Sequence, residues 1–411
     1  MCSPAYNDSI NTMQSQATKN GSSQGSSGTS SHPPKRAYIG LSGGVDSSVS
    51  AALLKNAGYD VTGVFIKVWQ PDWIECTWKE DRRDAMRVCA ILDILFVTLD
   101  LEKEYKKEVI DYMIEEYSKG RTPNPDVMCN KSVKFGAFYD WAMKQGADYV
   151  ATGHYARVGE GRKEKEEGES QREDNKKRSP FSVLRSSDYS LLAGNDTNKD
   201  QSYFLWNIKT EQLPHMLFPI GHLEKSEVRK LAAKFDLPTA EKKDSQGLCF
   251  IGKIDVKEFL STYIKQKPGN VLNAMGEIVG NHPGALLFTI GERHGFFIDK
   301  KTPHDGRFFV TSKDTTKNTI TVSSAPSDEM GARKMIATIS SINIINKNKW
   351  AMNAKLKARI RYRQPLQEII LRKFDDTTAT VEFATPQPTL TPGQSLVMYD
   401  SDECIGGGII D

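Results

Sequence analysis

Strand-like and helix-like segments alternate along the first part of the chain, and this alternation limits the possible folds more than any other feature. The predicted elements, in chain order, are a strand at 38–41, a helix at 46–58, a strand at 60–69, a helix at 80–93, a strand at 94–101, helices at 102–119 and 133–145, and a strand at 147–154. Strands that alternate with helices at this spacing pair in parallel. We therefore predict an α/β fold built on a doubly wound parallel sheet.

The chain is long enough for more than one domain. Its 411 residues exceed what one ordinary core accommodates, so we expect two or three domains. After about residue 258 short alternating strands replace the helices, which predicts a small β-rich domain followed by a barrel or sandwich. The predicted boundaries are a tail at 1–34, an α/β domain at 35–257, a central β-rich domain at 258–331 and a C-terminal β-barrel at 332–411.

Composition excludes several classes of protein. With 38% hydrophobic and 26% charged residues, the chain has the composition of a globular protein. No apolar run approaches the roughly 18–20 residues that cross a bilayer, so we expect no membrane partner. A net charge of +3 argues against a surface coated in positive charge but allows a local basic patch.

Two segments are too polar to contribute to a core. The tail is rich in Ser, Gly, Asn and Gln and holds only Asp8 and Lys19 as charges. It lacks the Arg-rich pattern of a transit peptide, so we expect a flexible tail on a cytoplasmic protein. Residues 159–180 hold seven acids and seven bases, which predicts a solvated insertion. This insertion separates two strand-like runs, 152–158 and 181–186, that we expect to pair as a hairpin.

The six cysteines follow no disulfide-framework spacing, which indicates a reducing compartment. They are Cys2, Cys76, Cys89, Cys129, Cys249 and Cys404. No C-x-x-C or paired histidine appears, so we expect no structural zinc. Cys76, Cys89 and Cys404 are interpreted as structural thiols.

The stretch "YIGLSGGVDSSVSAALL" carries the strongest chemical pattern. A predicted strand runs into Ser42–Ser47 and then into a helix, and glycines at such a turn let backbone N–H groups approach phosphate. It is neither a Walker A loop nor G-x-G-x-x-G. A Gly-rich turn without a ligand is the alternative. The hexapeptide resembles the S-G-G-x-D-S loop of ATP pyrophosphatases, which implies cleavage of ATP between its α and β phosphates.

Two cysteine-bearing segments narrow the chemistry. "TPNPDVMCN" (122–130) predicts a proline-stiffened polar loop, in which Asp126 lies three residues from Cys129, a spacing that suits acid–base work beside sulfur. A surface loop with an incidental cysteine is the alternative. "KDSQGLCFIG" (243–252) holds Cys249 in an apolar run, which by itself favours a buried core position.

Several stretches together resemble the tRNA-specific 2-thiouridylases, over about residues 36–411. They are "GLSGGVDSSVSA", "GRTPNPDVMCNKSVKF", "ATGHYARV", "NKDQSYFLW", "EKKDSQGLCFIG", "ARIRYRQ" and "TPGQS" followed by "GGGII". The resemblance implies replacement of the 2-oxygen of the wobble uridine by sulfur, with release of AMP and pyrophosphate. It implies ATP with Mg²⁺ as cofactor. The implied partners are tRNA of the Lys, Glu and Gln type and a sulfur-relay protein or cysteine desulfurase.

The resemblance also implies roles for individual residues. Cys249 matches the persulfide carrier, Cys129 the nucleophile that attacks the persulfide or forms a disulfide with Cys249, and Asp126 the acid–base residue. The positions that match ATP contacts are Gly40, Leu41, Ser42, Gly43, Gly44, Val45, Asp46, Ser47, Ile66 and Gly153. The positions that match tRNA contacts are Asn124, Pro125, Asp126, His154, Lys199, Asp200, Gln201, Arg361, Tyr362 and Gln394. The sequence departs from the family pattern at Ile66, commonly Met, and at Gln246, commonly Thr.

The stretch "KLKARIRYR" (355–363) places a basic residue at every second position. On a strand, all five would project from one face. Such a row repels itself unless a polyanion covers it, so we predict an RNA-binding surface on the C-terminal barrel. An ordinary solvated sheet face is the alternative.

Other functions stay open at this point. An adenylating ligase would share the Ser42–Ser47 loop but would need no cysteine pair. An RNA-binding protein with a silent ATP site would need neither an intact loop nor the cysteine pair. An iron–sulfur cluster held by Asp126, Cys129 and Cys249 is a variant of the thiouridylase hypothesis, although we expect no metal.

Overall fold

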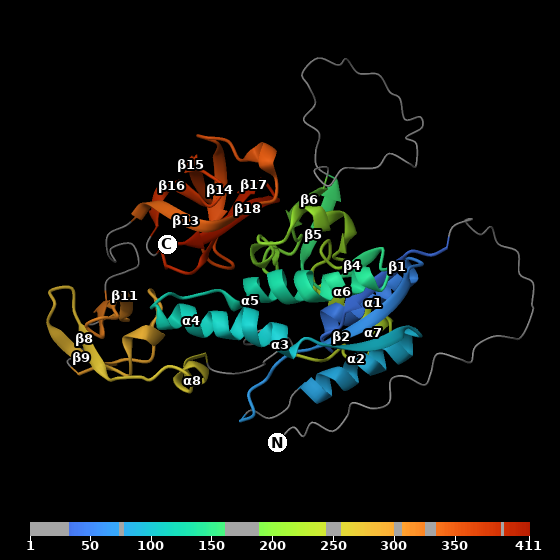
Figure 1. The fold of residues 1–411 in the computed structure, drawn as a ribbon, viewed down its shortest axis with the longest axis horizontal. Helices are drawn as coiled ribbons and strands as arrows, with labels where there is room; N and C mark the ends of the chain where they lie inside the picture. Colours follow the sequence, from blue (N-terminus) through green and yellow to red (C-terminus); the bar gives the residue numbers. More distant parts are fainter. Residues whose placement is uncertain are drawn as a thin grey trace, which may run out of the picture.

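The computed structural model describes residues 33–73, 78–160, 189–243, 256–299, 306–324, 334–387 and 390–411. Figure 1 shows three bodies: a parallel sheet with its helices, a small mixed sheet, and a barrel near the C-terminus. No helix in these residues is long and apolar enough to cross a membrane.

The first body is built on a parallel sheet with strand order β3-β2-β1-β4-β7. Its strands are β1 (Arg36–Gly40), β2 (Asp60–Lys67), β3 (Leu95–Asp100), β4 (Tyr149–Ala151) and β7 (Met216–Leu217). Every pairing between them is parallel. The strand order reverses at β1, between β2 and β4, and ligands of such sheets bind at this point, beyond the carboxyl ends of the strands. The predicted doubly wound α/β fold is confirmed.

Helices cover both faces of this sheet. Their bounds are α1 (Val45–Asn56), α2 (Trp78–Leu92), α3 (Glu102–Tyr105), α4 (Tyr112–Ser118), α5 (Pro125–Met128), α6 (Tyr139–Lys144), α7 (Lys225–Lys234) and α8 (Val256–Ser261), with π-helical stretches at Lys106–Asp111 and Cys129–Phe138. Helices α1 and α2 pack on one face, where Ile39 and Phe65 are buried, and the run from α3 to α6 packs on the other, against Val64 and Ile66.

The helix predicted at 133–145 begins earlier, at Pro125. The predicted proline-stiffened loop is therefore wrong from Pro125 onward, and Cys129 lies in a helix. Asn124 caps this helix by accepting a hydrogen bond from the Val127 N–H at 3.3 Å. Proline fits the first helical position because its missing N–H is not needed there. The prolines therefore start a helix rather than prolong a loop.

The predicted hairpin exists with a different second strand. β5 (Ala156–Glu160) pairs with β6 (Tyr189–Ala193), whereas the predicted partner at 181–186 lies outside the described residues. Leu191 of β6 is fully buried, and Cys404 pairs opposite it, so the hairpin extends the C-terminal sheet rather than the parallel one. Figure 1 shows β5 and β6 between the parallel sheet and the barrel.

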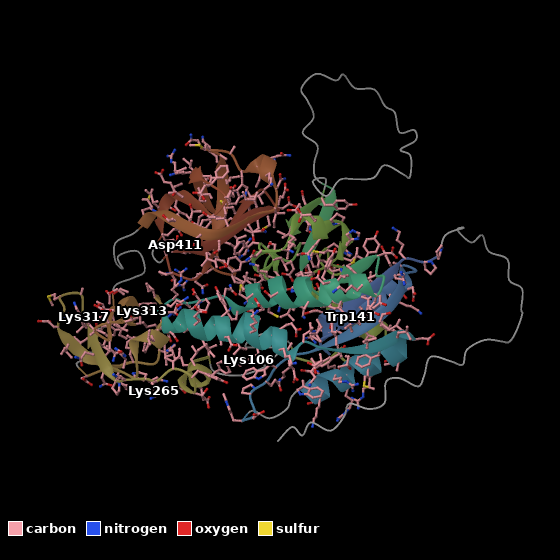
Figure 2. The ribbon with its side chains drawn as sticks, viewed as in Figure 1. Lys106, Trp141, Lys265, Lys313, Lys317 and Asp411 are labelled. Carbon is pink, nitrogen blue, oxygen red and sulfur yellow. The ribbon has the colours of Figure 1, made fainter. Side chains whose placement is uncertain are left out.

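The second body is a sheet of order β10-β9-β8-β12-β11 around a core that includes Phe288 and Val310. Its strands are β8 (Gly269–Leu272), β9 (Ile278–His282), β10 (Phe297–Ile298), β11 (Phe309–Asp314) and β12 (Thr319–Ser323). Lys313 and Lys317 of this body are labelled in Figure 2. The Lys313 ammonium donates to the Phe288 carbonyl at 2.6 Å, and burial lowers the pKa of Lys313 to about 8.

The third body is a closed barrel of order β13-β16-β15-β14-β17-β18, which confirms the predicted C-terminal β-barrel. Its strands are β13 (Lys334–Ile344), β14 (Lys355–Arg359), β15 (Gln367–Phe374), β16 (Thr378–Gln387), β17 (Ser395–Asp400) and β18 (Glu403–Ile410). The barrel closes where Ile339 pairs with Ile410. Asp411, labelled in Figure 2, follows this last strand.

The predicted row of five basic side chains is only partly confirmed. Lys355 and Lys357 are exposed on β14, with Leu356 and Ala358 buried in the barrel core as the alternation predicts. Arg359, however, is 9% exposed and pairs with Asp200 at 3.2 Å, over the ring of Tyr399.

Beyond Arg359 the strand ends, so the alternation stops. Arg363 has a φ of +64°, and its guanidinium donates to the Asn198 carbonyl at 3.1 Å. Arg361 donates to the Ile290 carbonyl in the second body at 2.7 Å. Arg361 and Arg363 therefore connect parts of the protein instead of extending a basic face.

Breaking the buried Arg359–Asp200 pair is expected to destabilise the protein. Arg359→Met leaves a buried carboxylate without its counter-charge, so the free energy of unfolding should fall by about 3–5 kcal/mol in urea denaturation. The control Arg372→Met removes the more exposed Arg372–Glu382 pair and should change it by at most about 1 kcal/mol. Equal small effects of both substitutions would contradict a structural role for the buried pair.

Candidate active site

The phosphate-type loop lies where the strand order reverses, at the carboxyl end of β1. Ser47 organises it: its hydroxyl accepts the Ser42 N–H at 3.2 Å and donates to the Gly44 carbonyl at 3.2 Å. Ser48 donates to the same carbonyl at 2.8 Å. Helix α1 starts directly after Gly44 without a side-chain cap, so its first N–H groups are placed as in helix termini that bind anions.

Two glycines of the predicted ATP site are required by close packing. Gly43 has a φ of +73°, and a Cβ there would lie 2.3 Å from the Asp81 carbonyl oxygen of α2. A Cβ on Gly153, after β4, would lie 2.7 Å from the backbone nitrogen of Ser47. The backbone at the carboxyl end of β4 is therefore in close contact with the loop that follows β1.

The remaining predicted ATP positions surround the same strand end. Ile66 is buried, and a Cβ on Gly40 would lie 3.9 Å from the Ile66 Cδ1 atom. Leu41 and Val45 are buried beside the loop, while the Ser42 side chain is exposed. The structure thus brings these positions together, although their contact with ATP stays a prediction.

Asp126 and Cys129 lie on the first turns of one helix, between two cores. Val127 packs against the hairpin and the barrel, together with Tyr203 and Tyr399. Cys129 packs against the sheet and α8, and is 0% exposed. The alternative of a surface loop with an incidental cysteine is therefore wrong, because helix formation turns the side chain inward.

A cavity of about 320 Å³ adjoins the start of this helix. It is lined by Met113 and Tyr117 of α4, Pro123, Asn124, Pro125 and Asp126, Phe204, Val256 of α8, and Gln394 before β17. Its walls therefore come from the α/β body with its helices and, through Gln394, from the barrel. Cavities of this size, with apolar walls and a few converging polar groups, are typical of small-ligand sites.

A turn of the barrel and a turn of the α/β body form hydrogen bonds with each other beside the cavity. Gln394 donates to the Thr122 carbonyl at 2.9 Å, and the Thr122 N–H donates to the Pro392 carbonyl at 2.8 Å. Thr122 also lies 3.3 Å from Thr289 of the second body, oxygen to oxygen. The segment that leads to Asp126 is thus held from both sides.

Three predicted tRNA positions, Lys199 to Gln201, bind other parts of the protein. Asp200 is 4% exposed and accepts the N–H groups of Gly194 and Ser202 in addition to pairing with Arg359. Gln201 accepts the Tyr155 N–H at 3.0 Å. Their predicted contact with tRNA stays a prediction, and in this structure they join the loop after β4 to the barrel.

Two further predicted tRNA positions lie deeper than a surface contact suggests. Burial is the first cause, and Lys134 the second, that hold the pKa of His154 well below its usual range. Lys134 can only donate, so the His154 Nε2 accepts from it and Nδ1 donates to Thr152 at 2.7 Å. Tyr362 packs on Phe204, with ring centroids 4.5 Å apart.

The three described free thiols are buried. Burial raises the pKa of both Cys89 and Cys404 to about 12, so neither is a thiolate at neutral pH, as expected for structural thiols. Cys2, Cys76, Gln246 and Cys249 lie outside the described residues. The residues that the structure describes contain no cluster of three or more His, Cys, Asp or Glu able to hold a metal.

The sequence did not identify several residues of the site. Phe204, Tyr117 and Val256 line the cavity, and Tyr155 and Lys225 contact the loop through Asp46. Phe204 lies within "NKDQSYFLW", one of the stretches that resemble the family, so the sequence could have suggested that it lies near the site. Lys225 belongs to a helix far along the chain, which no spacing connects to the loop.

Three family models match successive parts of the chain. The tRNA methyl transferase HUP domain model matches residues 35–253, the tRNA methyl transferase PRC-barrel domain model 257–324, and the aminomethyltransferase beta-barrel domain model 334–410. The tRNA-specific 2-thiouridylase MnmA of Geobacillus thermodenitrificans is 43% identical over 379 residues, 92% of this chain and 94% of that protein. The chain belongs to the tRNA-specific 2-thiouridylase family.

Other members of this thiouridylase family match equally well. Those of Lacticaseibacillus paracasei and Streptococcus thermophilus are 43% and 42% identical over 92% of this chain, and over 94% and 95% of their own lengths. A solved U34-tRNA thiolase, NcsA of Methanococcus maripaludis, is 16% identical over 56% of this chain and 66% of its own, with a TM-score of 0.33. That structural likeness is too low to bear on the assignment.

The burial of Cys129 predicts slow alkylation. Because the thiol reaches reagent only through local opening, we expect iodoacetamide to label Cys129 roughly tenfold or more slowly in the native protein than in urea. Cys89 and Cys404 serve as internal controls, and peptide mass spectrometry reports all three. Fast native labelling of Cys129 with both controls protected would contradict the inward orientation.

Proposed function

We propose that this protein is a tRNA-uridine 2-sulfurtransferase that adenylates the 2-oxygen of the wobble uridine and then replaces that oxygen with sulfur. The observation that carries the proposal is the cavity between the α/β body and the barrel, which Asp126 lines, with Cys129 three residues further along the same helix. Family membership supports the same reaction.

The loop Ser42–Ser47 is proposed to bind the phosphates of ATP. The uncapped start of α1 and the tight turn at Gly43 support this role, since both favour an anion close to the backbone. The uridine oxygen attacks the α phosphorus, the bond to the bridging oxygen breaks, and pyrophosphate leaves with the electron pair. We propose that Mg²⁺ accompanies ATP and shields its phosphate charge.

The cavity is proposed to hold the uracil base. Its volume and mixed walls suit a planar ring, with Phe204 and Tyr117 as apolar surface and Asn124, Asp126 and Gln394 as polar groups. Asp126 is proposed to be the acid–base residue that transfers the proton of the uracil ring during adenylation. Closing the site around the base protects the adenylated intermediate from water.

Sulfur transfer is proposed to use both cysteines. The terminal sulfur of a Cys249 persulfide attacks C2 of the activated base, and AMP leaves with the former 2-oxygen. The Cys129 thiolate then attacks the Cys249 sulfur, which releases the 2-thiouridine and leaves a Cys129–Cys249 disulfide that a thiol reductant must reopen. Val256 of α8 lines the cavity, and Cys249 lies outside the described residues.

The partners are proposed from the family resemblance. We propose tRNA of the Lys, Glu and Gln type as substrate and a sulfur-relay protein or cysteine desulfurase as donor, in the cytoplasm. His154, Lys199 to Gln201, Arg361, Tyr362 and Gln394 are proposed to act near the tRNA, at least partly by holding the three bodies in register. We also propose that the three domains are divided after residues 257 and 331.

The deciding experiment is nucleoside mass spectrometry of unmodified glutamate or lysine tRNA incubated with the protein, ATP and sulfide. We expect 2-thiouridine with the wild type and at least about a hundredfold less with Asp126→Asn, because acid–base catalysis contributes that much or more. Cys129→Ser and Cys249→Ser should abolish turnover with a persulfide donor. AMP without thiouridine would point to an adenylating ligase, and no product from folded protein to an RNA-binding protein.

The contact between Gly153 and the loop predicts a specific defect. A methyl group in Gly153→Ala must displace Ser47, and a shift near 1 Å lowers kcat/KM for ATP by about a hundredfold. Gly284→Ala is the matched control, because the nearest atom to its new Cβ lies at an ordinary 3.6 Å. Wild-type kinetics for Gly153→Ala at saturating tRNA would contradict the role of this contact.

A further inference from the structure

A lysine from a distant helix reaches the phosphate-type loop. The Lys225 ammonium contacts both carboxylate oxygens of Asp46, at 2.7 and 2.8 Å. The Tyr155 hydroxyl donates to the first of these oxygens at 2.8 Å. Asp46 is the fifth residue of the Ser42–Ser47 loop, so this cation lies directly at the loop.

The position of Lys225 is set by rigid structure rather than by a flexible surface chain. It is the first residue of α7, whose start is fixed by reciprocal hydrogen bonds between Glu224 and Glu227. The Lys225 N–H donates to Asp196 at 3.0 Å. Helix α7 packs on α1 through buried residues that include Val49 and Val228, and the Lys225 side chain is only 15% exposed.

The loop itself needs such a cation from outside. Ser42–Ser47 contains no Lys or Arg, unlike a Walker A loop, whose own lysine reaches the phosphates. A triphosphate carries several negative charges, and backbone N–H groups neutralise them only in part. Lys225, which comes from a distant helix, places at the loop the positive charge that a Walker A loop obtains from a lysine of its own sequence.

We propose that Lys225 is a residue of the ATP site that exchanges its partner during the reaction. It holds Asp46 through the ion pair before ATP binds, and it then stabilises the negative charge of the pyrophosphate. The pair retains contact with solvent, with Asp46 at 33% exposure, so it is weak enough to exchange. In adenylation the pyrophosphate gains the electron pair of the broken bond, and a nearby ammonium lowers the energy of that charge. This role rests on the proposed function.

Nucleotide binding separates this role from a structural one. We expect Lys225→Met to weaken ATP binding by about tenfold to a hundredfold, as the loss of a charged contact does, and to leave AMP binding unchanged. Lys225→Arg keeps the charge and should restore much of the ATP affinity. The control Lys230→Met removes an exposed lysine from the same helix and should alter neither.

Calorimetry on the full-length protein, without tRNA, gives both dissociation constants. Equal losses for ATP and AMP would show that Lys225 only supports the loop, and unchanged ATP binding would show that it takes no part; either result overturns the proposal. Failure of the wild type to form 2-thiouridine would refute the proposed function separately, because the difference between ATP and AMP is measured without the sulfur reaction.

Discussion

The close approach of Gly153 to the backbone of Ser47 is the contact on which the rest of the site depends. It exists because β1 and β4 are parallel neighbours, so their carboxyl ends meet at one edge of the sheet. From Gly153 a continuous series of contacts leads outward. Tyr155 binds Asp46, Gln201 holds the backbone of Tyr155, and the adjacent Asp200 pairs with Arg359 of the barrel. The position of the barrel is thereby coupled to the loop.

The helix that begins at Pro125 has a comparable role at the opposite side of the site. Its first turns lie between two cores, so that Val127 faces the barrel while Cys129 faces the sheet. Burial shields the Cys129 thiol from oxidation, and local opening has to precede the attack on a second sulfur that we propose for it. The proposed sulfur transfer therefore includes an opening of the structure around Cys129.

The sequence predicted the parallel sheet, the barrel and the phosphate-type loop, because each depends on local patterns. Strand–helix alternation and the glycines at 43 and 44 are of this kind. Two predictions failed, the first because of local capping and the second because of a tertiary contact. The prolines near Asp126 begin a helix, since Asn124 caps it, and the basic alternation of β14 stops at Arg359, where a buried carboxylate from another body pairs with the guanidinium.

The sequence by itself determined the motifs that this chain carries: a glycine-rich loop of the kind that binds phosphate, a carboxylate three residues from a thiol, and the similarity that places the chain in its family. Which residues meet was decided by the tertiary structure. Lys225 reaches Asp46 across 179 positions of sequence, and Gln394 reaches Thr122 across 272. Such contacts leave no periodic trace in the sequence, because they depend on how whole helices and turns pack, and packing is a property of the folded chain.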